Sequence, residues 1–354
     1  MNNPFIFIRG LRHVDHAVFC VENGQKFYWD PIFNTQVPFS SGQQVKRSIL
    51  DAICTRLQTQ PSSVEFVFGV TAKGALEEKE VLSICDPQYY DQILGGWMSA
   101  TQGGGTRTLK RRSPLSISAM RPLHPLLGSR YMENVSFDRS DKPELHKVTV
   151  RDSQGKTMST EEVEKLLEGT DRSLYRKWIP NNARAAGLFI YDVAIDLRTL
   201  FAVSINSFEP EITKEKVEEL REKGWISSKN VFGECLVMPK EQRDKAIPVI
   251  AKSLIDWRIT TNQARTFSLM ETLAIAISDN ANTLAGAIRA KLVDDSDKNK
   301  KVKPIIDETA GADLFVSLSC SGYIVTENES ADALAKAEEK LKTLISQFDY
   351  ENQR

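Results

Sequence analysis

Apolar and polar residues alternate at every second position in two segments, and this periodicity restricts the fold more than any other feature of the sequence. The first segment spans residues 189–197 and the second spans 314–320. Side chains with a period of two point to opposite faces of an extended chain, so each segment is predicted to be a β-strand with one buried face. The residues of that face are Phe189, Tyr191, Val193, Ile195 and Leu197 in the first strand, and Leu314, Val316, Leu318 and Cys320 in the second.

Other segments have the spacing of amphipathic helices. Val45, Ile49, Ile53 and Leu57 recur four residues apart, which predicts a helix that begins near residues 40–42. A capping box at 159–162 predicts a short helix over 161–167, and helices are also predicted at 247–257 and 332–348. Short strands are predicted at 5–11, 65–70 and 81–85. Strands and helices that alternate irregularly, with long insertions between them, indicate the α+β class.

Charge is balanced overall but unevenly distributed along the chain. The 354 residues carry 46 Lys and Arg against 47 Asp and Glu, so a nucleic-acid footprint would have to be local. No acidic residue occurs between Asp91 and Glu133, and three glycines at 103–105 would let backbone N–H groups approach phosphates closely. The alternative is a basic surface loop that faces acidic residues elsewhere in the protein. The cations of this basic segment are Arg107, Lys110, Arg111, Arg112, Arg121 and Arg130.

A second candidate anion site is the predicted helix start in the segment Phe-Ser-Ser-Gly-Gln-Gln-Val-Lys-Arg-Ser, residues 39–48. Hydroxyl groups and N–H donors at a helix start suit an anion. Lysine adds a point charge there, and arginine adds a planar fork for phosphate oxygens. The alternative is an ordinary helix cap with solvated charges. The candidate residues are Ser40, Ser41, Gln43, Lys46 and Arg47.

The sequence also argues against several other classes of protein. No apolar run approaches the length of a membrane span, and the first residues lack the pattern of a signal peptide. The five cysteines, at positions 20, 54, 85, 235 and 320, are scattered and include no Cys-x-x-Cys pair. Reduced thiols of a cytoplasmic protein are therefore expected, with neither disulfides nor a zinc site.

Five segments in the same order resemble the backbone subunits of CRISPR Cascade complexes, the seventh Cas protein family within the RAMP superfamily. Residues 39–49 are similar to the family's S-S-Q-x-x-K-R segment, and residues 93–98 to its L-F-G-R-M segment. Residues 113–124 resemble the strand that follows there, residues 187–197 the palm strand G-x-F-Y-x-Y-x-x-I-D-L, and residues 261–268 a late S-G-K-Q-N-x-F-A loop. The sequence departs from the family's motifs at two places. Gly42 is inserted before Gln43, and the late loop lacks the family's lysine before the glutamine and has Arg265 after Gln263 instead.

The resemblance implies an RRM-like (ferredoxin-like) palm with helical finger insertions and a β-hairpin thumb. It assigns residues 1–60, 187–240 and 305–354 to the palm, 61–128 to a finger with the basic segment, 129–186 to the thumb and 241–304 to a second helical insertion. Aromatic residues interleaved with cations are what a wedge between stacked bases needs, so the thumb tip is expected at one apolar cluster. Its residues are Leu174, Tyr175, Arg176, Lys177 and Trp178, and the alternative for them is packing in the core.

By resemblance, several copies of the chain would stack head to tail along a guide crRNA and hold its ribose-phosphate backbone. The implied partners are the crRNA, a target DNA or RNA strand that pairs with it, further copies of the chain and other Cascade subunits. No cofactor and no membrane partner are implied. The contacts would come from the helix-start residues, from the basic segment, and from Gln263 and Arg265. Repetition of a modest local patch would explain how a chain without net positive charge binds RNA.

The main alternative is a RAMP-type endoribonuclease subunit that cuts target RNA. Asp15 and Asp30 lie in the loop where related subunits carry a cutting aspartate, and His13, Asp15 and His16 could form a metal or acid–base group. A plain RRM protein is disfavoured, because neither long strand carries the aromatic RRM signature. A scaffold without RNA would leave the acid-free segment unexplained.

Overall fold

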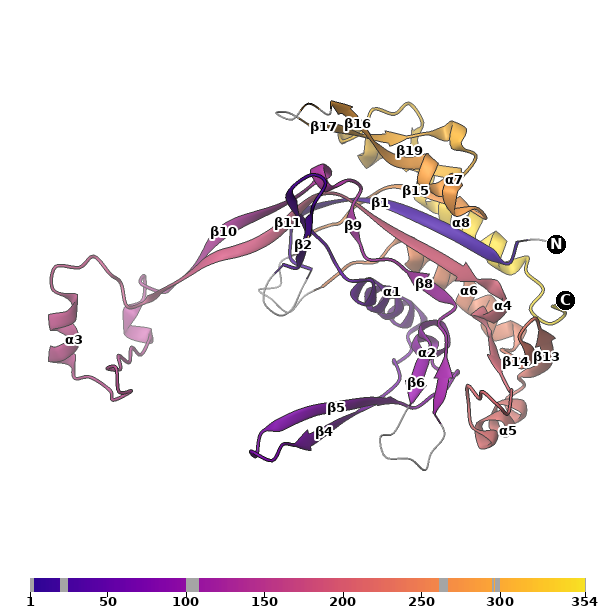
Figure 1. The fold of residues 1–354 in the computed structure, drawn as a ribbon, viewed down its shortest axis with the longest axis horizontal. Helices are drawn as coiled ribbons and strands as arrows, with labels where there is room; N and C mark the ends of the chain where they lie inside the picture. Colours follow the sequence, from indigo (N-terminus) through magenta and orange to yellow (C-terminus); the bar gives the residue numbers. More distant parts are fainter. Residues whose placement is uncertain are drawn as a thin grey trace.

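The computed structural model describes residues 3–19, 25–99, 108–260, 267–294, 296 and 300–353. Its centre is an eight-stranded sheet in which β11, β1, β15 and β18 lie side by side, each antiparallel to its neighbour (Figure 1). Along its other edge β11 pairs in turn with β10, β9 and β8, while β19 runs parallel to β18. The strands are β1 (Phe5–Ala17), β8 (Leu115–Ile117), β9 (Arg121–Pro122), β10 (Gly128–Asp138), β11 (Arg176–Asp196), β15 (Thr272–Ser278), β18 (Asp313–Ser317) and β19 (Glu329–Ser330).

Helices cover both faces of this sheet, because β1 sends apolar side chains alternately to each side. Ile6, Ile8 and Val14 join the larger core with helices α1 (Gly42–Leu57), α6 (Lys240–Ile255) and α8 (Ala333–Ser346). Leu11 faces the smaller core, which α7 (Ala281–Ala287) covers from the opposite side. None of the described helices is long and apolar enough to cross a membrane.

An arginine occupies the middle of the larger core. The Arg12 side chain is fully buried, and it donates hydrogen bonds to the carbonyl oxygens of Trp257 and Ile255, both at 2.7 Å. Its guanidinium lies 4.1 Å from the ring centroid of Trp257 and 5.1 Å from that of Tyr191. Burial lowers the pKa of Arg12 to about 10. Gly10 leaves room for this stack, since a Cβ there would come within 2.1 Å of the Tyr191 ring.

The α+β class is confirmed, whereas the specific RRM-like palm is not. In a β-α-β-β-α-β unit a helix separates the first two strands, which are not neighbours. Among the four central strands β1, β11, β15 and β18, β11 is second in sequence order, and it pairs directly with β1. The prediction that residues 241–304 form a helical insertion is wrong, because β15 within that range is a central strand of the main sheet.

The expected finger region is also more β-rich than predicted. It contains the hairpin β4 (Val64–Val70) and β5 (Leu76–Ser83), the short α2 (Tyr90–Gly95), and the hairpin β6 (Trp97–Ser99) and β7 (Leu109–Arg111). After β11 in the sequence, β12 (Ala202–Ser204), β13 (Ile226–Asn230) and β14 (Gly233–Val237) form a separate sheet beside α5 (Lys214–Glu222). The hairpin of β16 (Ile288–Asp294) and β17 (Lys301–Ile306) follows α7.

Strands β10 and β11 continue beyond the sheet as a two-stranded ribbon that projects far from the body (Figure 1). Gly187 lies where the ribbon leaves the sheet, and it adopts a φ of +127° with Leu127 O only 2.2 Å from where a Cβ would be. A head formed by residues 139–175 lies at the far end, and it contains α3 (Thr160–Leu167). The capping box predicted there is confirmed, with Ser159 and Glu162 capping each other's backbone N–H.

Candidate nucleic-acid interface

The start of α1 is held against the edge of the main sheet. Ser40 pairs with Met120 through two backbone hydrogen bonds of 2.9 and 3.0 Å. Ser41 is the N-cap, and its side chain accepts a hydrogen bond from Gln44 N. The Ser40 hydroxyl is buried and donates to Gln44 Oε1 at 3.0 Å. The two serines therefore build the helix start, and Gln43 is the predicted contact that lies exposed beside them.

The inserted Gly42 has a steric reason. A Cβ at this position would lie 2.8 Å from the carbonyl oxygen of Ile117 and 3.2 Å from the carbonyl carbon of Ser118. Contacts that close require the backbone to move, so only glycine lets the first turn of α1 approach this strand edge. Gly42, at which the sequence departs from the family-like motif, is thus the residue that lets α1 pack against the segment before Arg121.

The lysine and the arginine of the first turns of α1 have different surroundings. Lys46 is partly buried and donates a hydrogen bond of 2.6 Å to Gly95 O, and burial lowers its pKa to about 8. Arg47 is exposed and forms an ion pair of 2.9 Å with Asp51, four residues along the helix. An exposed pair of this kind is weak, so Arg47 can exchange Asp51 for a phosphate at little cost.

The predicted basic segment divides into separate places. The prediction that Arg111 contacts RNA is wrong, because its guanidinium is buried. It donates hydrogen bonds to Ile93 O, Thr199 O and the Glu211 carboxylate. Lys110 is exposed and lies 3.8 Å from Glu209. Arg130 packs over the Phe27 ring with its guanidinium 4.1 Å from the ring centroid.

Two other segments with predicted cations, those of Arg112 and Arg121, pack beside the start of α1. Arg112 is exposed, and its backbone packs against Gly96, next to the carbonyl that Lys46 binds. Arg121 follows Met120, the partner of Ser40, and its guanidinium lies 3.8 Å from Asp192. The chain segments that carry Arg112 and Arg121 thus pack beside the start of α1, which carries Gln43 and Arg47. Arg107, Gln263 and Arg265 lie outside the described residues.

The cluster predicted as the thumb tip does not belong to the core. Trp178 is 59% exposed, so the alternative of core packing is wrong for it. The cluster lies where the ribbon joins the outermost part of the projection, which is the head of residues 139–175. Leu174 and Tyr175 end the head, while Arg176, Lys177 and Trp178 begin β11 and pair with residues 136–138 of β10. Arg176 forms an ion pair of 2.7 Å with Asp138 across this ladder.

Of the residues of the nuclease alternative, only the neighbours Asp15 and His16 lie side by side, 3.4 Å apart, whereas His13 and Asp30 have other partners. His13 Nδ1 lies 2.8 Å from Glu271 Oε1, and the His13 ring stacks on Tyr323. His16 instead packs against Tyr131, so the two histidines have different partners. Asp30 accepts hydrogen bonds from the N–H groups of residues 32 and 33 and thereby holds a turn. Among the described residues, no three His, Cys, Asp or Glu side chains are placed to hold a metal ion.

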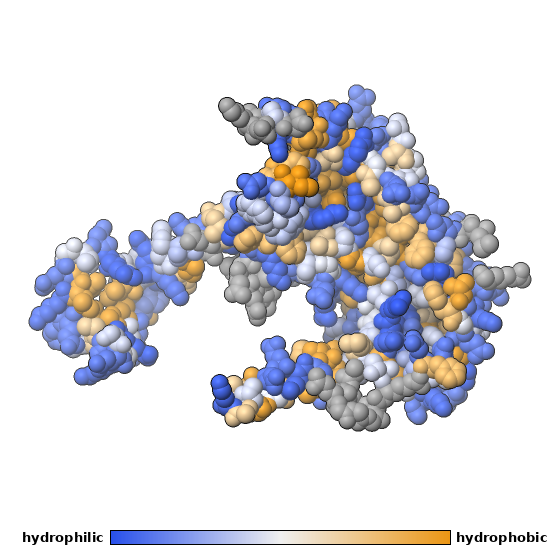
Figure 2. Space-filling view, viewed as in Figure 1, coloured by the Kyte–Doolittle hydropathy of each residue, from blue (hydrophilic) through white to orange (hydrophobic). Residues whose placement is uncertain are grey.

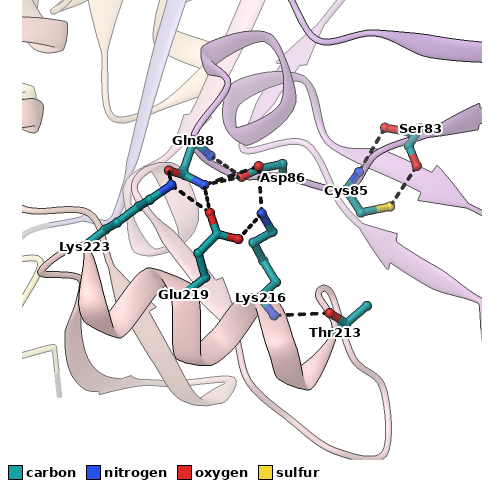
Figure 3. Close-up of polar contacts among 8 residues, drawn as sticks. All are labelled: Ser83, Cys85, Asp86, Gln88, Thr213, Lys216, Glu219 and Lys223. Carbon is teal, nitrogen blue, oxygen red and sulfur yellow. Dashed lines mark hydrogen bonds and ion pairs between the residues drawn. The ribbon is translucent and has the colours of Figure 1, made fainter.

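Another group of ionisable side chains joins α5 to the loop before α2 (Figure 3). Lys216 bonds both Asp86, at 2.9 Å, and Glu219, at 2.5 Å, and Lys223 bonds Glu219 at 2.7 Å. Hydrogen bonds from Lys216, Lys223 and Gln88 lower the pKa of Glu219 to about 2. Glu219 thus stays ionised between two lysines, and the whole group has the arrangement of a structural clamp.

An aromatic hairpin that the sequence did not predict lies directly before α1. The hairpin of β2 (Phe27–Asp30) and β3 (Thr35–Pro38) carries three consecutive exposed aromatic residues, Phe27, Tyr28 and Trp29. Its second strand leads directly into Ser40 and α1, and it packs beside β9 and β10. The signal available in the sequence was the aromatic run itself, within a segment predicted to be a loop.

Comparisons with known proteins identify no family for this chain. No family model and no curated protein match the sequence. Among solved structures, a chain of a "CRISPR RNA-guided surveillance complex" matches 96% of this chain and 84% of its own length, with 9% identity and a TM-score of 0.36. A chain of a "CRISPR RNA-guided surveillance complex, pre-nicking" matches 96% and 89%, with 9% identity and a TM-score of 0.40. TM-scores below 0.5 do not establish a shared fold, so the interpretation of the site rests on its own geometry and on the sequence motifs.

Proposed function

We propose that this chain is a non-catalytic backbone subunit of a Cascade-type CRISPR surveillance complex and grips single-stranded guide RNA along its ribose-phosphate backbone. The observation that carries the proposal is that the segments of Arg112 and Arg121 pack beside the start of α1, where Gln43 and Arg47 are exposed. Exposed guanidinium groups around a helix start provide charge and directed hydrogen bonds for successive phosphates. The order of the five family-like motifs in the sequence supports the same assignment.

Recognition of sequence then belongs to base pairing. Contacts to phosphates and sugars fix the register of a strand and carry no sequence information directly, so the bases of the crRNA stay available to a target strand. The few exposed cations on one copy give weak binding, and copies placed side by side on one RNA multiply it. The projecting ribbon suits contact with the next copy in a head-to-tail filament, since such interfaces repeat without closing. Other Cascade subunits would end the filament.

We expect the purified protein to bind single-stranded RNA with little base preference and with a marked dependence on salt. If Arg47, Arg112 and Arg121 each neutralise one phosphate, log K should fall with log salt at a slope of about −2, because each phosphate contributes about −0.7. Fluorescence anisotropy of a labelled oligonucleotide, measured over a salt series, gives this slope. A slope near zero would refute the electrostatic basis of the proposal.

A double variant tests whether these particular cations act. Arg112→Ala with Arg121→Ala should reduce the slope by about 1.4 units, since two phosphate contacts are lost. The matched control is Lys240→Ala with Lys336→Ala, which removes two exposed cations that form ion pairs on α6 and α8. The control should keep the wild-type slope. Equal losses in both double variants would mean that the RNA responds to net charge alone.

We also expect no cleavage of RNA by this chain. Asp30 holds a turn, and His13 and His16 have separate partners. Labelled target RNA, incubated with the assembled complex and Mg²⁺ and resolved on a denaturing gel, should remain intact. Cleavage that disappears in Asp15→Ala or Asp30→Ala would instead assign the chain to the RNA-cutting branch.

A further inference from the structure

The β2–β3 hairpin exposes more aromatic surface than its own packing can explain. Phe27 is 42% exposed, Tyr28 40% and Trp29 55%. Alternation along the strand places Phe27 and Trp29 on one face and Tyr28 on the other. On the second face Tyr28 contacts Phe39, with ring centroids 5.9 Å apart. The face of Phe27 and Trp29 therefore carries two large rings that remain open to solvent.

An arginine borders this open face. The guanidinium of Arg130 lies 4.1 Å from the Phe27 ring centroid and donates to the side chain of Gln36, which is opposite Trp29 in the hairpin. Its Nε has no hydrogen-bond partner within the described part of the chain. The one carboxylate of the hairpin, Asp30, is engaged with its own turn. The charge bordering the rings is therefore positive.

The hairpin is also placed on the path of the proposed RNA contacts. Its second strand ends at Pro38, and Ser40 and Ser41 at the start of α1 follow immediately. Arg121, a proposed phosphate contact, lies in β9 beside β3. One short stretch of chain thus joins open aromatic rings to the cations that would hold phosphates. Aromatic side chains beside a basic groove are the usual platform for unstacked bases of single-stranded nucleic acid.

We propose that Phe27 and Trp29, bordered by Arg130, form a stacking platform for an unpaired base of a single-stranded nucleic acid. The platform rests on the proposed function, because the same strand would place its phosphates at the start of α1. Every base has a π face, so the platform would accept any base. The ligand is therefore a single strand, and a duplex with its bases stacked internally would not occupy the site.

Tryptophan fluorescence reports on this platform directly. Trp97, Trp225 and Trp257 are buried, so Trp178→Phe leaves Trp29 as the one exposed tryptophan of the five. In the full-length Trp178→Phe protein, oligo(U) RNA should quench Trp29 emission and reduce its accessibility to acrylamide. In the same background, Trp29→Ala should weaken binding roughly fivefold to a hundredfold, with an unchanged salt slope. A melting curve confirms that this exposed position leaves the fold intact.

The matched control is Phe232→Ala. Phe232 is 56% exposed and lies under the guanidinium of Arg198 at 4.8 Å, in the turn between β13 and β14, so it reproduces the chemistry of the platform at another place. The affinity of the Phe232→Ala variant for oligo(U) should equal that of the Trp178→Phe protein in which it is made. Salt-dependent binding without a change in Trp29 emission or in the affinity of Trp29→Ala would overturn the platform and leave the proposed function standing. If the protein did not bind oligo(U) at all, both the platform and the proposed function would be refuted. If Trp29 emission fell with rising protein concentration alone, the hairpin would instead be assigned to a contact between protein molecules.

Discussion

Arg12→Ala should destabilise the isolated protein by about 3–5 kcal/mol, the cost typical of breaking a buried charged network. The substitution removes one hydrogen bond each from Trp257 O and Ile255 O and empties the space beside the rings of Trp257 and Tyr191. Within the part of the chain that the structure describes, Trp257 O would keep only its bond from Arg258, and Ile255 O only its bond from Thr272. Chemical denaturation followed by far-UV circular dichroism should show a lower midpoint.

Arg47→Ala is the control for the loss of an arginine as such. Its ion pair with Asp51 is exposed, and pairs of this kind contribute under about 1 kcal/mol. An equal shift of the midpoint in both variants would mean that Arg12 contributes no more than a surface charge. A stability of Arg12→Ala close to wild type would show that water can replace the guanidinium in the core.

Removal of the head should abolish assembly on RNA and leave the body folded. Arg139 and Tyr175 are hydrogen-bonded across the end of the ribbon, so replacing residues 140–174 by Asn-Gly closes the ribbon with a two-residue turn. The head contributes little to the core, since Leu145 is 68% exposed and Leu166 59%. Figure 2 shows apolar surface on the head, well separated from the body. Melting should therefore be nearly unchanged, while sedimentation should show no filaments on a long single-stranded RNA.

A second variant separates the head from the ribbon. Trp178→Ala keeps the head and removes one exposed ring from the β10–β11 ladder. Filaments should therefore still form on RNA, but they should be less ordered. If the protein without its head still forms filaments of normal length, the ribbon has no part in contacts between copies. If that protein instead unfolds, the head is a packed part of the body.

The sequence predicts elements well where the periodicity is strong and the surroundings are simple. The alternation at 189–197 coincides with β11 as far as Asp196, and the spacing of Val45, Ile49 and Ile53 matches the buried face of α1. The strand at 314–320 is shorter than predicted, because the chain turns into a 3-10 helix at Leu318. The central strand β15 escaped prediction altogether. Its sequence, Thr-Leu-Ala-Ile-Ala-Ile-Ser, is buried on both faces and therefore has no polar alternation.

The candidate site was harder to predict, because its composition depends on tertiary contacts. A count of charges cannot distinguish Arg111, which is buried against Glu211, from Arg112, which is its exposed neighbour. The role of Gly42 likewise appears only once Ile117 is placed against it. The aromatic hairpin shows the opposite problem. Its residues are conspicuous in the sequence, but their exposure is a property of the folded surface.

The unbroken course of β11 has a mechanical consequence. This strand of 21 residues runs from the outer end of the ribbon to the middle of the sheet, where its inner half pairs with β1 over residues 185–196. Tension applied along the ribbon at the head therefore reaches the β1–β11 ladder as shear, with many backbone hydrogen bonds loaded at once. The same tension on β10 reaches Gly128, where that strand ends. The ribbon is thus attached to the sheet mainly through β11. It can bend at its base while the hydrogen bonds between β1 and β11 remain intact.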